Sequence, residues 1–481
     1  LLAGSPQAQD LAPKISGNAL AVMQLGNQAA LNGDYAQAGQ LFGTLQQDSM
    51  VGLIKPLLLA WARFGEGNTQ VALSMLGRHF NGGAFGSVYV LNAALIADAA
   101  HDDSDAAELY AAVMTDQPNL RLAQILASWL ARHGQSVKAE QELAALAAAH
   151  PDLQMALPAL QAQIQMPVVS TAREGMAEAY LTLAGSLGAR QQSFLRITFL
   201  QFALQLRPDL TAARLLLASA QASGDDPTVP PTQIQMQNAL ATLQQVKPGD
   251  ALYGPAASQE ANLLAALDRP EEALALLNQL IATSPGNLDL LVNAGDVLRG
   301  ANEYAAAITY YDKAIAVVGN PPPRGAWPMF YDRGICEDQL GNWPAAQADM
   351  LAALALSPDQ PYVLNYLGYS WAQRGERLQQ AHTMLQQAAG LDPNDGAVID
   401  SLGYVNLREG HTEAAVRLLT QAVQLEPDNA EVNAHLAEAF WQAGQKLQAN
   451  YQWRRALEMQ PDAKLRAEIT GKLQQYFTPP A

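Results

Sequence analysis

The chain has 481 residues, of which 49% are hydrophobic and 15% are charged, and its net charge is -17 at pH 7. With 28 lysines and arginines against 45 aspartates and glutamates, phosphate backbones and anionic lipid surfaces would repel it, which argues against a nucleic-acid partner. The one cysteine, Cys336, cannot form an internal disulfide, and no apolar run is long enough to span a bilayer as a helix.

Residues 1–14 are expected to be an exposed N-terminal segment before the first helical pattern, which begins near Ile15. The stretch Leu1-Leu2-Ala3-Gly4 is typical of the end of an export signal. It also resembles the residues that precede the lipidated cysteine of bacterial lipoproteins, although Ser5 stands where that cysteine would be. Either the native chain carries a lipid anchor here, or an ordinary signal peptidase cleaves it. We expect a periplasmic protein, with an outer-membrane anchor and a cytoplasmic location left open.

From residue 15 to residue 320, small residues recur at a spacing that suits close contact between paired helices. These residues are Gly26, Ala60, Ala94, Ala127, Ala184, Ala218, Ala261 and Gly295. Wider steps between some of them indicate an irregular insertion with an extra helix at 152–178 and a proline-rich loop at 223–232. We therefore expect an N-terminal arc at 15–151 and a middle arc at 179–320.

The pattern is clearest in the C-terminal array, residues 321–477, where four prolines stand 35, 34 and 34 residues apart. They are Pro358, Pro393, Pro427 and Pro461. Small residues keep the same step upstream, at Gly334, Gly368, Gly403 and Ala437. A period of about 34 residues is typical of stacked helical hairpins, which share one continuous core and leave an extended concave face.

One unit explains the spacing. Gly368 lies among the apolar residues of a first helix, where a side chain would hold the partner helix away. Gly375 ends that helix, because glycine accepts a positive φ. Pro393 closes the second helix, which it cannot continue. Together these positions resemble the tetratricopeptide repeat. The resemblance implies an all-α fold, an α-solenoid with a right-handed superhelix of about twelve hairpins.

The resemblance also implies a concave groove lined by the first helix of each unit, at positions three before, one after, and four or five after the small contact residue. The corresponding residues are Asn365, Tyr369, Gln373, Asp400, Tyr404, Arg408, Glu438, Trp441 and Gln442. We expect Tyr369, Tyr404 and Trp441 to form an aromatic strip that holds an extended peptide, since rings supply contact area and amides pair with backbone groups. The cationic clamp with which some members hold a terminal carboxylate is absent, because only Arg408 is basic.

A third insertion, residues 319–328, is rich in proline and contains Trp327. Such insertions are often neutral surface loops. Because Trp327 would be an exposed aromatic residue in this loop, we interpret the insertion as a second candidate docking site for a partner.

Residues 362–375 and 395–405 resemble the C-terminal repeats of exported bacterial tetratricopeptide proteins, some of which are adaptors for carboxy-terminal processing proteases. The resemblance implies a scaffold that presents a client to a protease. Two alternatives remain: an accessory subunit of an envelope or secretion complex, and a cytosolic assembly factor. The partner is a protein in each case.

Motifs for catalysis are missing from the sequence. The seven histidines form no His-Glu-x-x-His pair and have no cysteine partners, and no phosphate-binding glycine loop occurs. Ser370 partly imitates a nucleophile elbow but lacks the second glycine and a preceding strand. We therefore expect no enzyme activity, no cofactor and no metal site.

Overall fold

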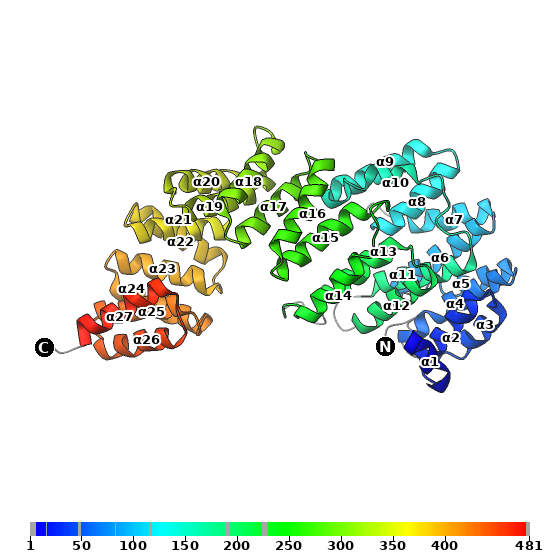
Figure 1. The fold of residues 1–481 in the computed structure, drawn as a ribbon, viewed down its shortest axis with the longest axis horizontal. Helices are drawn as coiled ribbons and strands as arrows, with labels where there is room; N and C mark the ends of the chain where they lie inside the picture. The colour runs from blue at the N-terminus through cyan, green and yellow to red at the C-terminus, as the bar shows by residue number, and fades with distance from the viewer. Residues whose placement is uncertain are drawn as a thin grey trace. The chain divides into compact units, whose positions relative to one another are not determined.

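A computed structural model describes residues 6–15, 17–46, 50–81, 83–114, 118–187, 193–223 and 229–477, and every regular element in them is a helix. Residues 1–5, in which the sequence predicts the end of an export signal, and the middle of the proline-rich loop, 224–228, lie outside the described residues. Two compact units make up the fold, Leu1–Val297 and Leu298–Ala481. Figure 1 follows their helices in chain order, from blue to red.

The first unit consists of helices that follow one another along the chain. They are α1 (Pro6–Leu11), η1 (Ala12–Ile15), α2 (Ala19–Leu31), α3 (Tyr35–Gly43), η2 (Met50–Leu53), α4 (Lys55–Gly65), α5 (Thr69–Gly77), η3 (Gly83–Phe85), α6 (Gly86–Ala99), α7 (Asp103–Val113), α8 (Leu120–Arg132), α9 (Ser136–Ala149), η4 (Pro151–Leu153), α10 (Leu157–Ala162), α11 (Ala172–Ser186), α12 (Ser193–Leu206), α13 (Thr211–Ser223), α14 (Gln233–Leu243), α15 (Tyr253–Ala266), α16 (Pro270–Thr283) and α17 (Leu288–Gly300), whose last residues belong to the second unit.

The second unit also consists of successive helices. Its elements are α18 (Tyr304–Val318), η5 (Arg324–Ala326), α19 (Trp327–Gln339), α20 (Trp343–Leu356), α21 (Pro361–Arg374), α22 (Leu378–Leu391), α23 (Gly396–Arg408), α24 (Thr412–Leu425), α25 (Ala430–Gln442), α26 (Lys446–Glu458) and α27 (Ala463–Phe477). Consecutive helices pack as hairpins, among them α19 with α20, α21 with α22, α23 with α24 and α25 with α26. The expected α-solenoid is confirmed.

The small residues fill the contacts for which the sequence predicts them. All twelve, from Gly26 to Ala437, are buried. A Cβ atom built on Gly368 would lie 2.8 Å from Cγ of Leu385, and one on Gly403 would lie 2.6 Å from Cγ of Leu419. Since real side chains do not approach so closely, each pair of helices can touch only because glycine occupies its crossing point.

Local signals set the helix ends. The side chain of Asp395 accepts hydrogen bonds from the first backbone N–H groups of α23, and Asn429, 34 residues later, does the same for α25. Such caps satisfy donors that have no partner within the helix. Gly375 ends α21 with φ at 69°, in the left-handed region that glycine adopts without strain. Capping and termination therefore recur with the hydrophobic period.

The first unit departs from simple stacking of neighbours. Helix α11 packs against α4 and α6, and α12 packs against α2, although these partners lie far apart in the chain, with α6 ending at Ala99 and α11 beginning at Ala172. Gly175 of α11 lies against the ring of Trp61, and the hydroxyl of Tyr180 donates a hydrogen bond to Oδ1 of Asn27 at 3.1 Å. The fully buried carboxylate of Glu178 pairs with the guanidinium groups of Arg121 and Arg207. Buried polar contacts thus join the beginning and the middle of this unit.

Other sequence expectations can be placed in the fold. Cys336 is completely buried in α19, and Ser370 lies within α21 with 5% of its surface exposed. The insertion at 152–178 begins within η4 and contains α10, and its last residues belong to α11. Among the described residues, no helix combines the length and the apolar character needed to cross a membrane.

Candidate binding groove

The first helices of the last repeats line a groove of about 810 Å³ within the second unit. Helices α21, α23, α25 and α27 supply most of the lining of this groove, together with Trp453 of α26 and Asp462 just before α27. Its lining residues are Tyr369, Gln373, Arg374, Tyr404, Leu407, Arg408, Glu431, Ala434, His435, Glu438, Gln442, Trp453, Asp462, Lys464, Leu465, Glu468, Ile469 and Lys472. Six of the ten sequence-predicted partner-binding residues are among them.

Three aromatic rings lie together in this groove. The centroid of Tyr404 is 5.3 Å from that of Tyr369 and 4.5 Å from that of His435. Tyr369 and Tyr404 hold the same repeat position on α21 and α23, so the repeat step turns both side chains to the same face. The sequence therefore predicted the pairing of the two tyrosines. It missed His435 as the third ring.

A spacing in the sequence would have pointed to His435. Asn365, Asp400 and His435 stand 35 residues apart, the same step that relates Tyr369 to Tyr404. Nδ1 of His435 donates a hydrogen bond to Oδ2 of Asp400 at 2.8 Å. Burial lowers the pKa of His435, but the carboxylates of Asp400 and Glu431 raise it by more, so the pKa lies above its ordinary value.

Hydrogen bonds fix the tyrosines and the arginine. The hydroxyl of Tyr369 donates to Oε1 of Glu431 at 2.7 Å, across two repeats. Burial, followed by the carboxylates of Glu431 and Asp400, raises the pKa of Tyr369, so its hydroxyl stays protonated. Nη1 of Arg408 donates to the hydroxyl of Tyr404 at 3.1 Å and to the carbonyl of Gln373 at 3.2 Å. The groove is thus held in shape before any ligand enters.

Charges of both signs surround the rings. Lys472 of α27 pairs with Glu438 at 2.8 Å and with Glu468 at 2.9 Å, and Arg374 pairs with Asp338 at 2.6 Å. Arg408 is exposed at the edge. A polypeptide backbone, which carries donors and acceptors but no net charge, suits such a mixed lining better than a highly charged ligand does.

Asn365 and Asp400, both predicted from the repeat position, do not line the groove. Asp400 is 5% exposed, and its Oδ1 atom has no hydrogen-bond partner among the described residues, like Oδ1 of Asn365. These are two buried acceptors at the same position of consecutive repeats. A buried acceptor without a donor is costly, so an ordered water that donates a hydrogen bond would be favoured there.

Trp441 does not join Tyr369 and Tyr404. Its ring stacks on that of Tyr476, with 4.0 Å between centroids and 14° between planes. The centroid of the Phe477 ring lies 5.5 Å away in an edge-to-face arrangement. The repeat pattern does not show this, because α27 follows the last hairpin and covers the surface where a next repeat would pack. Trp441 therefore anchors the C-terminal helix.

Trp327 also differs from the expected exposed loop aromatic. It is the first residue of α19, it is half-buried, and its ring lies 6.2 Å from that of Tyr331. Pro328 at the second position favours the helix start, because the N–H group that proline lacks would have no hydrogen-bond partner within the first turn of the helix. The proline-rich insertion ends at Ala326, two residues earlier than the sequence indicated, and Trp327 packs against the core of the unit.

Comparison with known families identifies the repeats. Residues 258–322 and 331–396 match one family model of the tetratricopeptide repeat, and residues 406–468 match a second. Over these residues the chain resembles the tetratricopeptide repeat. An array of such repeats is a scaffold for protein–protein contacts, and the family is in general non-catalytic.

Similar proteins include the TPR repeat-containing protein PA4667 of Pseudomonas aeruginosa, which is 29% identical over 214 residues. The match covers 42% of this chain and 33% of that protein, so the chain spans about a third of this curated relative. Among solved structures, the APC/C hetero-tetramer Cut9-Hcn1 aligns with 97% of this chain and 91% of its own, at 16% identity and a TM-score of 0.44. The thermophilic TPR protein TTC0263 of Thermus thermophilus aligns with 39% of this chain and 98% of its own, at 25% identity and a TM-score of 0.33.

Proposed function

We propose that the C-terminal tetratricopeptide repeats hold an extended segment of a partner protein, and that the chain is a non-enzymatic adaptor of the bacterial cell envelope. The observation that carries the proposal is the groove in which Tyr369, Tyr404 and His435 lie together under a rim of mixed charge. Aromatic rings bury a large apolar area at a low cost in conformational entropy, which suits a flexible peptide ligand.

The roles of individual residues follow from their contacts. The ring of Tyr404 contacts both other rings of the groove, those of Tyr369 and His435. Arg408 donates a hydrogen bond to the hydroxyl of Tyr404. Gln373 and Gln442 are exposed amides in the lining, able to donate to and accept from a peptide backbone. Glu438, held by Lys472, fixes the position of α27 against the array. The peptide would lie along the rings between α27 and the first helices.

The envelope location and the work with a processing protease rest on the N-terminal motif and on the resemblance of residues 362–375 and 395–405 to exported repeats. The client would be delivered to the protease while one of its extended segments occupies the groove. Fractionation of cells that produce the full-length precursor tests the location. Recovery in the cytosol alone would favour an assembly factor instead.

A photo-crosslinking amino acid placed at Gln373 or Gln442 tests the groove itself. Both side chains are exposed and line the groove, so each should crosslink to one defined segment of the same envelope protein, mapped by mass spectrometry. The matched control is the same amino acid at Gln379, an exposed position on α22 outside the lining. Crosslinks of equal yield and pattern from Gln379 would overturn the proposal.

A further inference from the structure

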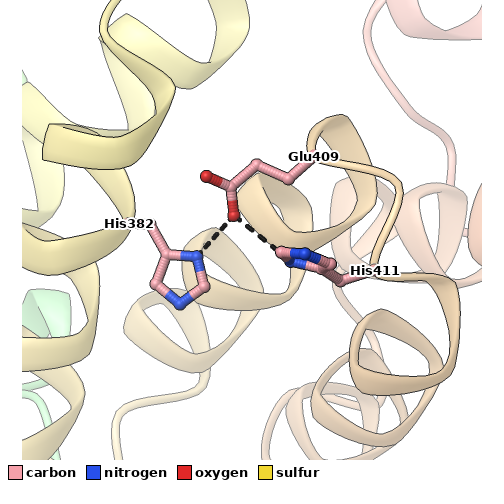
Figure 2. Close-up of side chains that lie close together, drawn as sticks. All are labelled: His382, Glu409 and His411. Carbon is pink, nitrogen blue, oxygen red and sulfur yellow. Dashed lines mark hydrogen bonds and ion pairs between the residues drawn. The ribbon is translucent and has the colours of Figure 1, made fainter.

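Two histidines and a glutamate from consecutive hairpins meet away from the groove lining. His382 lies on α22, Glu409 is the residue after α23, and His411 directly precedes α24. Nδ1 of His382 is 2.5 Å from Oε2 of Glu409, and Nδ1 of His411 is 3.4 Å from the same oxygen. Figure 2 shows the two imidazole rings on either side of this carboxylate. All three ligand atoms lie within 4.8 Å of one another.

The chain turns sharply to bring two of these groups together. Gly410, between Glu409 and His411, has φ at 80°, a conformation in which most other residues would be strained. His382 approaches from the preceding hairpin, 27 residues earlier than Glu409. That separation explains why the spacing of histidines in the sequence indicated no metal site: the three residues converge only through the stacking of two repeats.

The electrostatic setting favours a cation. Glu409 caps the C-terminus of α23, where the partial negative charge of the helix dipole makes a second negative charge unfavourable. Within the described residues, the ion pairs of Glu409 are those with the two imidazoles, which are neutral unless protonated. Its side chain is 13% exposed and that of His382 is 28% exposed, so water screens the carboxylate only in part. A divalent ion would neutralise it.

One of the ligand separations already matches that around a small transition-metal ion, and a second is shorter. Zn²⁺ binds histidine nitrogen and carboxylate oxygen at about 2.0–2.2 Å, so ligand atoms around a tetrahedral ion lie about 3.3–3.5 Å apart. The separation of 3.4 Å between His411 and Glu409 fits this value. The shorter separation from His382 is that of a hydrogen bond, and it would open by about 1 Å as the metal replaces the shared proton. The side chain of His411 is 60% exposed and leaves an entry path from solvent.

We propose that His382, Glu409 and His411 form a binding site for a divalent transition-metal ion of the zinc class. Two imidazoles and one carboxylate are a ligand set that such ions accept, and three protein ligands leave a fourth position for water. The bound ion joins the hairpin of α21 and α22 to that of α23 and α24. It therefore stiffens the contact between two consecutive repeats, both of which contribute a tyrosine to the groove.

The test uses the full chain without a purification tag, treated with a chelator and then dialysed. Titration with Zn²⁺ by calorimetry, and with Co²⁺ by visible absorption, should show one site per chain, with a Kd of about 1 µM. His382→Gln and His411→Gln should each weaken binding at least about tenfold, and Zn²⁺ should raise the melting temperature of the wild type but not of these variants. His150→Gln, at an exposed histidine of the first unit, is the matched control and should bind as the wild type does.

Circular dichroism of the metal-free variants checks that they are folded, and His411 is exposed enough for its replacement to leave the core intact. No saturable binding by the wild type up to about 100 µM Zn²⁺ would overturn the proposal. Equal affinity in His411→Gln and the wild type would overturn it as well, since binding would then arise elsewhere on the acidic chain.

Discussion

The indole ring of Trp441 stacks on the phenol ring of Tyr476, 4.0 Å between centroids, and this contact seats the last helix on the last hairpin. Trp453 lies 6.0 Å from the same ring and is fully buried. In a repeat array each hairpin is covered by the next one, so the end of the array needs a cap. Helix α27 supplies this cap and, through Lys472, part of the lining of the groove.

Tyr476→Ala should loosen this cap. Aromatic pairs contribute about 0.5–1.5 kcal/mol beyond the area that they bury, so we expect a loss of about 1–3 kcal/mol in the free energy of unfolding of the C-terminal repeats. Relative to the wild type, the variant should show a larger increase in the rate of backbone amide hydrogen exchange in α27 than in α21. Unchanged protection of α27 in the variant would mean that the stacking does not hold the helix.

Gly368→Leu tests the repeat register. Because a Cβ atom at Gly368 would lie 2.8 Å from Leu385 and 3.2 Å from the backbone oxygen of Ala381, the new side chain must push the two helices apart. We expect a cost of about 1–3 kcal/mol, measured by thermal or denaturant unfolding. Gln379→Leu, the same new side chain at an exposed position of α22, should be nearly neutral. Equal melting temperatures for the two variants would contradict the assigned register.

These glycine contacts show which part of the fold is accessible from the sequence. Gly368 and Leu385 belong to one hairpin, so the period alone places them together. The contact of Gly175 with Trp61 joins residues far apart in the chain, and no period relates them. Similarly, Tyr369 and Tyr404 were predictable because they share a repeat position, whereas the cover over Trp441 depends on a helix outside the repeat pattern. Contacts within a repeat or between equivalent repeat positions can be predicted from the sequence, whereas contacts between residues that no repeat relates cannot.

The buried carboxylate of Glu178 allows a sharper test of the first unit. Arg121→Met would leave this fully buried charge with Arg207, whose Nη1 atom is 3.5 Å away. Removing one partner of a buried pair commonly costs about 3–5 kcal/mol, so unfolding should require much less denaturant. Arg63→Met breaks an ion pair with Glu66 in which the arginine is 45% exposed, and should cost less than about 1 kcal/mol. Similar losses of unfolding free energy in Arg121→Met and Arg63→Met would contradict the claim that the buried carboxylate of Glu178 depends on Arg121.

The pair of His435 and Asp400 gives the groove a pH dependence. The pKa of His435 is raised in the folded state, so the stability that its protonated form contributes is fully present below its unfolded pKa of about 6.5 and is lost as the pH rises through the folded value. The difference in free energy of unfolding between the wild type and His435→Gln should therefore be larger at about pH 5.5 than at about pH 8.5. A difference that grows toward alkaline pH would contradict the raised pKa.

Capture of a peptide by the groove is the central claim, and the affinity of one peptide for matched variants tests it most directly. The peptide is the segment that crosslinks to Gln373 and Gln442, labelled and titrated by fluorescence anisotropy. Tyr404→Ala should weaken its binding more than about tenfold, since an anchoring aromatic residue commonly contributes over about 2 kcal/mol. Arg408→Ala should weaken it less, because Arg408 lies at the exposed edge, and Gln379→Ala should not change it. The same Kd for the wild type and a folded Tyr404→Ala variant would contradict the account.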